Sequence, residues 1–107
     1  MTVNANFVYM TAGNRQEAEA VGAALVEAKL AACINIVENM TSMFIWQGAA
    51  QHETEVVVIA KTVAERVPAL IEKVRSIHSY ECPCIVCLPI TDGNPDFLEW
   101  IAEEVEL

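Results

Sequence analysis

The side chains best suited to bind a metal ion are gathered in one short stretch, at His78, Cys82 and Cys84. Imidazole nitrogen and thiolate sulfur are donors that Cu(I) and Zn(II) accept in proteins. Residues two apart in an extended strand point to the same side, so the two thiols share a face if Pro83 keeps the pleat. This spacing predicts a soft-metal site. The alternative is that both cysteines are small core residues and that His78 closes a helix, where its charge suits the helix dipole.

A second group of residues combines carboxylates, a lysine and aromatic rings. If copies of the chain assemble, this group predicts a pocket between subunits for a small anion or metabolite. The alternative is a structural ion pair at an interface, with the tryptophan as packing. The sequence shows no Ser/His/Asp set, phosphate-binding loop or catalytic carboxylate pair, so we expect no enzyme. The group consists of Trp46, Glu55, Lys61, Tyr80 and Glu81.

The element that must position both groups is a long β-hairpin. Its first arm, roughly 32–46, and its second arm, roughly 54–61, are rich in β-branched and aromatic residues. A polar turn containing Gly48 joins them. Strands usually run about 5–6 residues, so the first arm is unusually long even with a bulge at Glu38-Asn39. The alternative is two short strands broken at that point.

The rest of the chain alternates strands and helices. We expect strand 6–11, then a helix that Asn14 caps, with Glu17 completing a capping-box-like start. A second helix begins near Thr62 and Pro68 and ends at 78–81. A strand over 82–88 follows, with Pro83 suiting a sheet edge, and Asn94-Pro95 opens a last helix.

This order, β-α-β-β-α-β plus a terminal helix, predicts one α+β domain over 1–107. Split βαβ units form an antiparallel sheet with both main helices on one face and strand order 4-1-3-2. The second strand is then an exposed edge. The end of the first strand, at Met10, lies beside the start of the fourth, so its thioether is a further candidate metal ligand.

Composition narrows the function classes. The 107 residues carry a net charge of −9 and 54% hydrophobic residues. With no basic stripe, nucleic acid and anionic membranes are poor partners. No apolar run reaches the ~18 residues of a membrane span, and the N-terminus lacks the pattern of a secretory signal. Four cysteines without a disulfide-scaffold pattern fit the reducing cytoplasm. We expect the excess apolar surface to form an oligomer interface.

Several short segments follow one another in a characteristic order along the chain: 31–36, Thr41-Ser42, Trp46-x-Gly48, Glu55, Lys61-Thr62, His78-x-Tyr80-Glu81, 88–90 and Asn94. Together they resemble the CutA family of divalent-cation tolerance proteins. The resemblance implies a ferredoxin-like domain, a homotrimer related to PII signalling proteins, and a link to copper and other divalent cations. It implies a soluble, mostly cytoplasmic protein without an established enzymatic reaction.

The chain departs from the family pattern around the proposed metal site. Ser79 replaces a proline, and Cys82-Pro83-Cys84 stands where Val-Pro-Glu is usual. Some relatives have a copper-linked cysteine at the position of Met10 and a second histidine at that of Ile77. We therefore expect a non-enzymatic, trimeric, metal-responsive protein. The alternatives are a PII-like regulator that binds a small ligand and an uncharacterised enzyme that uses the intersubunit pocket.

Overall fold

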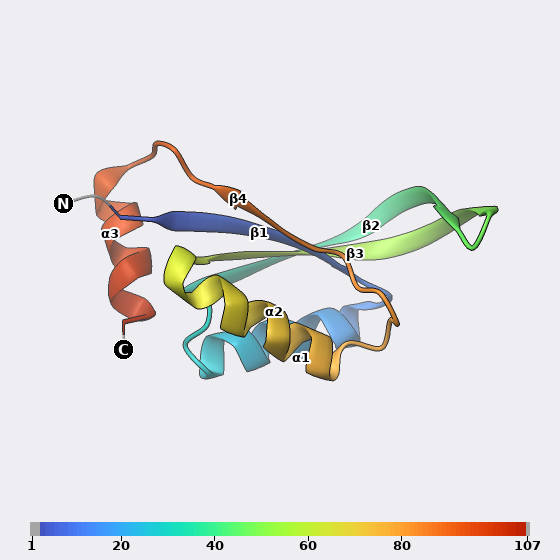
Figure 1. The fold of residues 1–107 in the computed structure, drawn as a ribbon, viewed down its shortest axis with the longest axis horizontal. Helices are drawn as coiled ribbons and strands as arrows, with labels where there is room; N and C mark the ends of the chain where they lie inside the picture. The colour runs from blue at the N-terminus through green and yellow to red at the C-terminus, as the bar shows by residue number, and fades with distance from the viewer. Residues whose placement is uncertain (1–2, 107) are drawn as a thin grey trace.

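A four-stranded antiparallel sheet with helices on both sides forms the protein (Figure 1). The structure is a computed structural model that describes residues 3–106. Its elements are β1 (Ala5–Ala12), α1 (Arg15–Glu27), β2 (Cys33–Trp46), β3 (Ala49–Val63), a 3-10 turn (Ala64–Arg66), α2 (Val67–Ile77), β4 (Ile85–Pro89) and α3 (Pro95–Glu104). The strand order β2-β3-β1-β4 confirms the predicted topology with β2 at an edge.

The hairpin of β2 and β3 is continuous. Its first arm, of 14 residues, matches the predicted long strand, and its second arm, of 15 residues, is longer than predicted. A bulge between Val37 and Met40 interrupts the register, and Asn39 there has a φ of 64°. The turn is only two residues, Gln47 and Gly48, both with positive φ, which matches the twist of the flanking strands. The prediction of a longer polar turn was therefore wrong. The hairpin extends well beyond the helices (Figure 1), along the 47 Å axis of the molecule.

The main core lies between the sheet and α1 with α2. Val8, Met10, Val58, Leu25 and Leu70 are among its buried residues. The predicted cap of α1 is present, since the Asn14 side chain accepts a hydrogen bond of 2.8 Å from the Glu17 backbone N–H. None of the described helices is long and apolar enough to cross a membrane.

A smaller core lies on the opposite face of the sheet, under α3. It contains Ala5, Val63, Ile101 and Val105. Asn94 caps α3 and Pro95 occupies its first turn, as predicted. Because α3 crosses only one end of this face (Figure 1), the rest of the face carries no helix. We call this uncovered surface, over Tyr9, Val37, Ile59, Val86 and Leu88, the open face.

Two predicted boundaries were wrong. β4 begins at Ile85 rather than Cys82, and residues 79–82 form bends. Pro83 lacks the N–H that a strand would donate, which explains the late start. Thr62 belongs to β3 and is fully buried, so it does not open α2. A 3-10 turn separates the two elements, and Pro68 then lies in the first turn of α2, where a missing N–H costs little.

Candidate functional site

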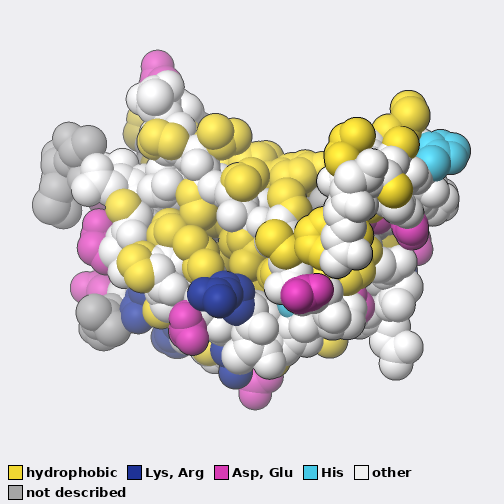
Figure 2. Space-filling view, turned by 45° about the vertical axis from the view of Figure 1, so that its right-hand side comes forward, with side chains coloured by type: hydrophobic (Ala, Val, Ile, Leu, Met, Phe, Trp, Pro, Cys, Tyr) yellow, Lys and Arg dark blue, Asp and Glu magenta, His cyan; other side chains and the backbone are white. Residues whose placement is uncertain are grey.

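Alternation along β3 decides which residues face the site. Val56, Val58 and Ala60 point into the main core, so the odd-numbered residues, including Glu55 and Ile59, point to the open face. Val37, Val86 and Leu88 are exposed there, and Leu88 keeps 56% of its surface accessible. Figure 2 shows that hydrophobic side chains form a broad exposed band across this side of the molecule.

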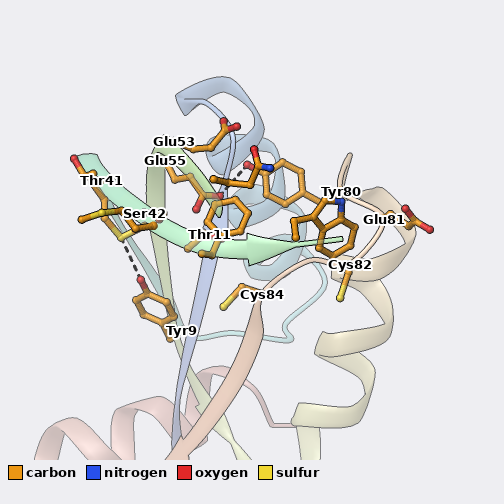
Figure 3. Close-up of a pocket in the computed structure, with 15 residues that line it drawn as sticks. Tyr9, Thr11, Thr41, Ser42, Glu53, Glu55, Tyr80, Glu81, Cys82 and Cys84 are labelled. Atoms are coloured by element: carbon orange, nitrogen blue, oxygen red, sulfur yellow. Dashed lines mark hydrogen bonds between the residues drawn. The ribbon is translucent and has the colours of Figure 1, made fainter. Parts of the chain in front are cut away.

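A pocket of about 770 Å³ lies on the open face, between the hairpin and the segment that leads into β4. Figure 3 shows Glu53 and Glu55 on one side of it and Cys82 and Cys84 on the chain that passes below Tyr80. Four of the five residues of the predicted intersubunit cleft line it. These are Trp46, Glu55, Tyr80 and Glu81.

Lys61, the fifth residue of the predicted cleft, is elsewhere. It pairs with Cys33 and with Phe7 in the sheet, and its ammonium group donates to the side-chain oxygen of Asn35. Lys61 lies six positions along β3 from Glu55, a span of about 20 Å. Within one chain, the lysine–carboxylate arrangement is therefore not formed, and no Lys, Arg or His is among the described residues that line the pocket.

Both candidate thiols line the pocket. Cys82 is exposed and Cys84 is half-buried. Burial raises the pKa of the Cys84 thiol, and the charges of Glu55 and Cys82 raise it further. This thiol therefore stays protonated at neutral pH until a metal cation replaces the proton. The predicted shared strand face does not apply, because neither cysteine lies in β4.

His78 is held inside the fold by both ring nitrogens. Its Nε2 lies 2.8 Å from the Thr11 carbonyl oxygen, and its Nδ1 accepts a 3.0 Å hydrogen bond from the Tyr80 backbone N–H. Its side chain is only 1% exposed. Neither nitrogen is available to a metal ion unless one of these bonds breaks. In the structure, His78 therefore closes the end of α2. This was the alternative to metal binding that the sequence left open.

Met10 points away from the thiols. It is 1% exposed and belongs to the main core, whereas its neighbours Tyr9 and Thr11 line the pocket. Adjacent residues of a strand face opposite sides of the sheet, which explains the separation. Among residues 3–106, no three His, Cys, Asp or Glu side chains are grouped closely enough to hold a metal ion. The predicted set of Met10, His78, Cys82 and Cys84 is thus not brought together in one chain.

The most buried charged group of the pocket is Glu55, which is 7% exposed. Its Oε2 accepts a 2.8 Å hydrogen bond from the Tyr80 hydroxyl. Burial, this hydrogen bond and the charge of Glu55 raise the pKa of Tyr80 to about 12. Tyr80 therefore remains a neutral donor at physiological pH and holds the 78–84 segment against the hairpin.

Sequence reasoning missed several further pocket residues, among them Tyr9, Met40 and Phe44. The Tyr9 hydroxyl donates a hydrogen bond of 3.2 Å to the Met40 sulfur. The sequence signal for Phe44 and Met40 was the two-residue alternation along β2. Every second residue before Trp46, namely Phe44, Ser42 and Met40, lies on the same face. The bulge before Met40 resets that period, and it lies at Glu38-Asn39, where the sequence placed it.

Comparison with known proteins defines the family. Residues 6–104 match the family described as CutA1 divalent ion tolerance protein. The divalent-cation tolerance protein CutA of Archaeoglobus fulgidus is 44% identical over 101 residues, covering 94% of this chain and 98% of the relative. The CutA homolog of Xenopus laevis is 42% identical over 97 residues, covering 91% of this chain. The chain spans 64% of the length of the Xenopus relative and 58% of a mouse CutA protein.

Solved structures agree. The CutA1 structure from Ehrlichia chaffeensis superimposes with a TM-score of 0.92 at 31% identity and full coverage of both chains. The CutA structure from Archaeoglobus fulgidus gives 0.92 at 43% identity, covering 95% of this chain and 99% of that one. The chain therefore belongs to the CutA1 divalent ion tolerance family, as the sequence motifs indicated, and has the expected α+β fold.

Proposed function

We propose that this chain is a single-domain, homotrimeric divalent-cation tolerance protein that binds copper or another heavy-metal ion and catalyses no reaction. Family membership supports a role in cation tolerance and favours it over the small-ligand regulator that the sequence also suggested. We place the protein in the cytoplasm, where its free cysteines stay reduced.

The observation that carries the metal function is the pair of free thiols, Cys82 and Cys84, that lines an open pocket. Glu55 lines the same pocket as the two thiols and adds a carboxylate to its side chains. Two thiolates are soft ligands that suit Cu(I), and the cation itself promotes their deprotonation. Two ligands leave the coordination sphere open, so a residue of another subunit or a water molecule has to complete it.

The trimer is supported by the open face and the projecting hairpin. A chain of this size rarely exposes a large contiguous apolar patch unless another molecule covers it. Here Val37 on β2 and Val86 and Leu88 on β4 remain exposed, and β2 is an uncovered edge strand. Assembly through this face would cover both features with copies of the same chain.

Light scattering and native mass spectrometry test the proposal. At micromolar concentration, the protein should have about three times the chain mass of 11.7 kDa, and the reduced trimer should retain Cu(I). Val86→Asp should break the assembly, because it places a charge on the open face. The matched control is Val26→Asp, an exposed valine on α1, which should leave the trimer intact. A wild-type monomer, or a reduced trimer that retains no Cu(I), contradicts the proposal.

A further inference from the structure

The far half of the hairpin carries two soft-metal donors that the proposed Cys82/Cys84 site does not use. Met43 on β2 and His52 on β3 are direct cross-strand partners in the sheet register. Side chains opposite each other in an antiparallel pair lie on the same face, with Cβ atoms about 4.5–5.5 Å apart. A thioether sulfur and an imidazole nitrogen can therefore reach one ion between them.

This pair lies on the face of the hairpin that is turned away from the open face. Even-numbered residues of β3, such as Val56 and Val58, point to the core side of the sheet, so His52 points to that side as well. Met43 borders the pocket, but alternation with Phe44 turns its side chain to the side of His52. Because the hairpin extends beyond α1 and α2 (Figure 1), none of the described helices covers this face. Assembly through the open face leaves it accessible.

Both donors are free to bind an ion. Met43 keeps 79% of its surface accessible, more than any other large hydrophobic residue among those described. His52 is exposed and takes part in none of the side-chain hydrogen bonds or salt bridges found among residues 3–106. The ring of His78, by contrast, uses both nitrogens within the fold. His52 is thus the histidine that can offer a nitrogen to a metal ion.

The surroundings of the pair select the kind of ion. Its cross-strand neighbours on the same face are Thr41 with Thr54 on one side and Ile45 with Ala50 on the other. None of these four residues carries a carboxylate. Ca²⁺ and Mg²⁺ bind through several oxygen ligands, usually including carboxylates, which this face does not supply. A thioether selects Cu(I), and imidazole also binds copper, so the donor set fits Cu(I).

We propose that Met43 and His52 form a second Cu(I) site, one on each hairpin and separate from the Cys82/Cys84 pocket. The Met43 sulfur and one ring nitrogen of His52 bind the ion, and solvent occupies any further position. The inference rests on the proposed copper function for the choice of metal, but it shares no ligand with that site. Because neither ligand is charged, we expect this site to bind Cu(I) more weakly than the two thiolates do.

NMR titration of the reduced 107-residue protein, labelled at the methionine methyl groups, tests the inference. The probe is Ag(I), a diamagnetic ion with the charge of Cu(I) and a similar preference for soft ligands. Once the thiols are saturated, the Met43 methyl resonance should shift in a saturable way, with up to one further ion per chain. A Met43 resonance that stays in place throughout the titration overturns the inference.

Variants show whether the two residues act as a pair. His52→Gln, at an exposed position, should raise the Ag(I) concentration that shifts Met43 at least about tenfold. Met40→Leu is the matched control, because Met40 lies on the same strand but on the open face, and it should leave the Met43 titration unchanged. If Met43 titrates alike in wild type and in His52→Gln, the methionine binds alone and the inference is wrong.

A further variant separates this inference from the proposed function. Cys82→Ser with Cys84→Ser should retain the Met43 shift, because the two sites share no ligand. Loss of the shift in this variant assigns the ion to the pocket and overturns the inference. Retention of Cu(I) by the reduced wild-type trimer, measured on the same samples, reports on the proposed function. A Met43 shift that depends on His52 in a protein that retains no Cu(I) supports the silver-binding pair and contradicts the copper function alone.

Discussion

The Tyr80 hydroxyl and the Glu55 carboxylate are joined by a 2.8 Å hydrogen bond that ties the 78–84 segment to the hairpin. The bond fixes one wall of the pocket, because Tyr80 and Glu55 line the pocket together with the thiols of Cys82 and Cys84. It also places Tyr80 beside Gly13, where an added Cβ would lie 3.2 Å from the tyrosine hydroxyl oxygen. The β1–α1 turn, the segment before β4 and the hairpin therefore meet at this tyrosine.

The first prediction concerns alkaline titration of Tyr80. Burial and Glu55 raise its pKa to about 12, above an ordinary value of about 10. The stability that its neutral phenol contributes is therefore present below pH 10 and lost as the pH rises towards 12. Ultraviolet difference titration should show a tyrosine that ionises near pH 12 and that is missing in Tyr80→Phe. Indistinguishable late titration in the two proteins would contradict the hydrogen bond.

The second prediction concerns Glu17, whose carboxylate accepts backbone hydrogen bonds from two separate turns. Its Oε2 accepts from the Ser79 N–H at 2.8 Å, and its Oε1 accepts from the Gly13 N–H at 3.3 Å. Burial alone would raise the pKa of Glu17, but the Ser79 and Gly13 hydrogen bonds and His78 outweigh it and lower the pKa. Its stabilising effect is thus present above the unfolded-state pKa and lost as the pH falls through the folded-state pKa.

Glu17→Gln should therefore destabilise the protein by about 1–2 kcal/mol at pH 7, since an amide N–H₂ group then faces a backbone donor. Urea unfolding at pH 7 and at pH 3 is the measurement, and the difference from wild type should shrink at the lower pH. Glu19→Gln is the control on the same helix, because its pair with Arg15 is exposed to solvent and contributes little to stability. Equal effects of the two substitutions would argue against a stabilising role for the Glu17 hydrogen bonds.

The third prediction concerns the contact of α1 with β2 at Gly22. A Cβ added there would lie 2.8 Å from Cγ2 of Ile34. Helix propensity alone predicts that Gly22→Ala stabilises the protein by about 1 kcal/mol. We expect the opposite, a loss of about 1–3 kcal/mol, because the core has no room for the methyl group.

The midpoint of urea unfolding at constant slope measures this change. Gly93→Ala is the control, since its nearest neighbour, Leu98, would be at an ordinary 3.6 Å. A stabilised Gly22→Ala variant would show that α1 does not pack as closely on β2 as described.

The sequence was sufficient for the features that depend on local signals. The cap at Asn14, the proline after Asn94 and the alternation in the hairpin each predicted an element that the structure confirms. Strand order followed from the sequence of elements, because few topologies connect them without crossing. Element boundaries were predicted less accurately where one residue disfavours the secondary structure that its neighbours favour, as Pro83 does by delaying the start of β4.

The candidate site was harder to predict, because topology places backbones but not side chains. Met10 is opposite Ile85 in the register, as strand order requires, yet its side chain enters the core. Side chains alternate between the two faces of β1, and Met10 occupies one of the positions that face the core. His78 was placed correctly at the end of α2, but its two hydrogen bonds, to Thr11 and Tyr80, depend on a loop that no periodic pattern describes.

Competitive titration of Cu(I) against a chelator, under reducing conditions, tests the central claim most directly. Cys82→Ser with Cys84→Ser should weaken binding at least about tenfold, or about 1.4 kcal/mol. Cys33→Ala with Cys87→Ala should stay within a factor of a few of wild type, because neither residue lines the pocket. Light scattering checks the assembly of each variant. If the Cys82/Cys84 variant keeps its Cu(I) affinity while the Cys33/Cys87 variant loses it, the proposed metal site is wrong.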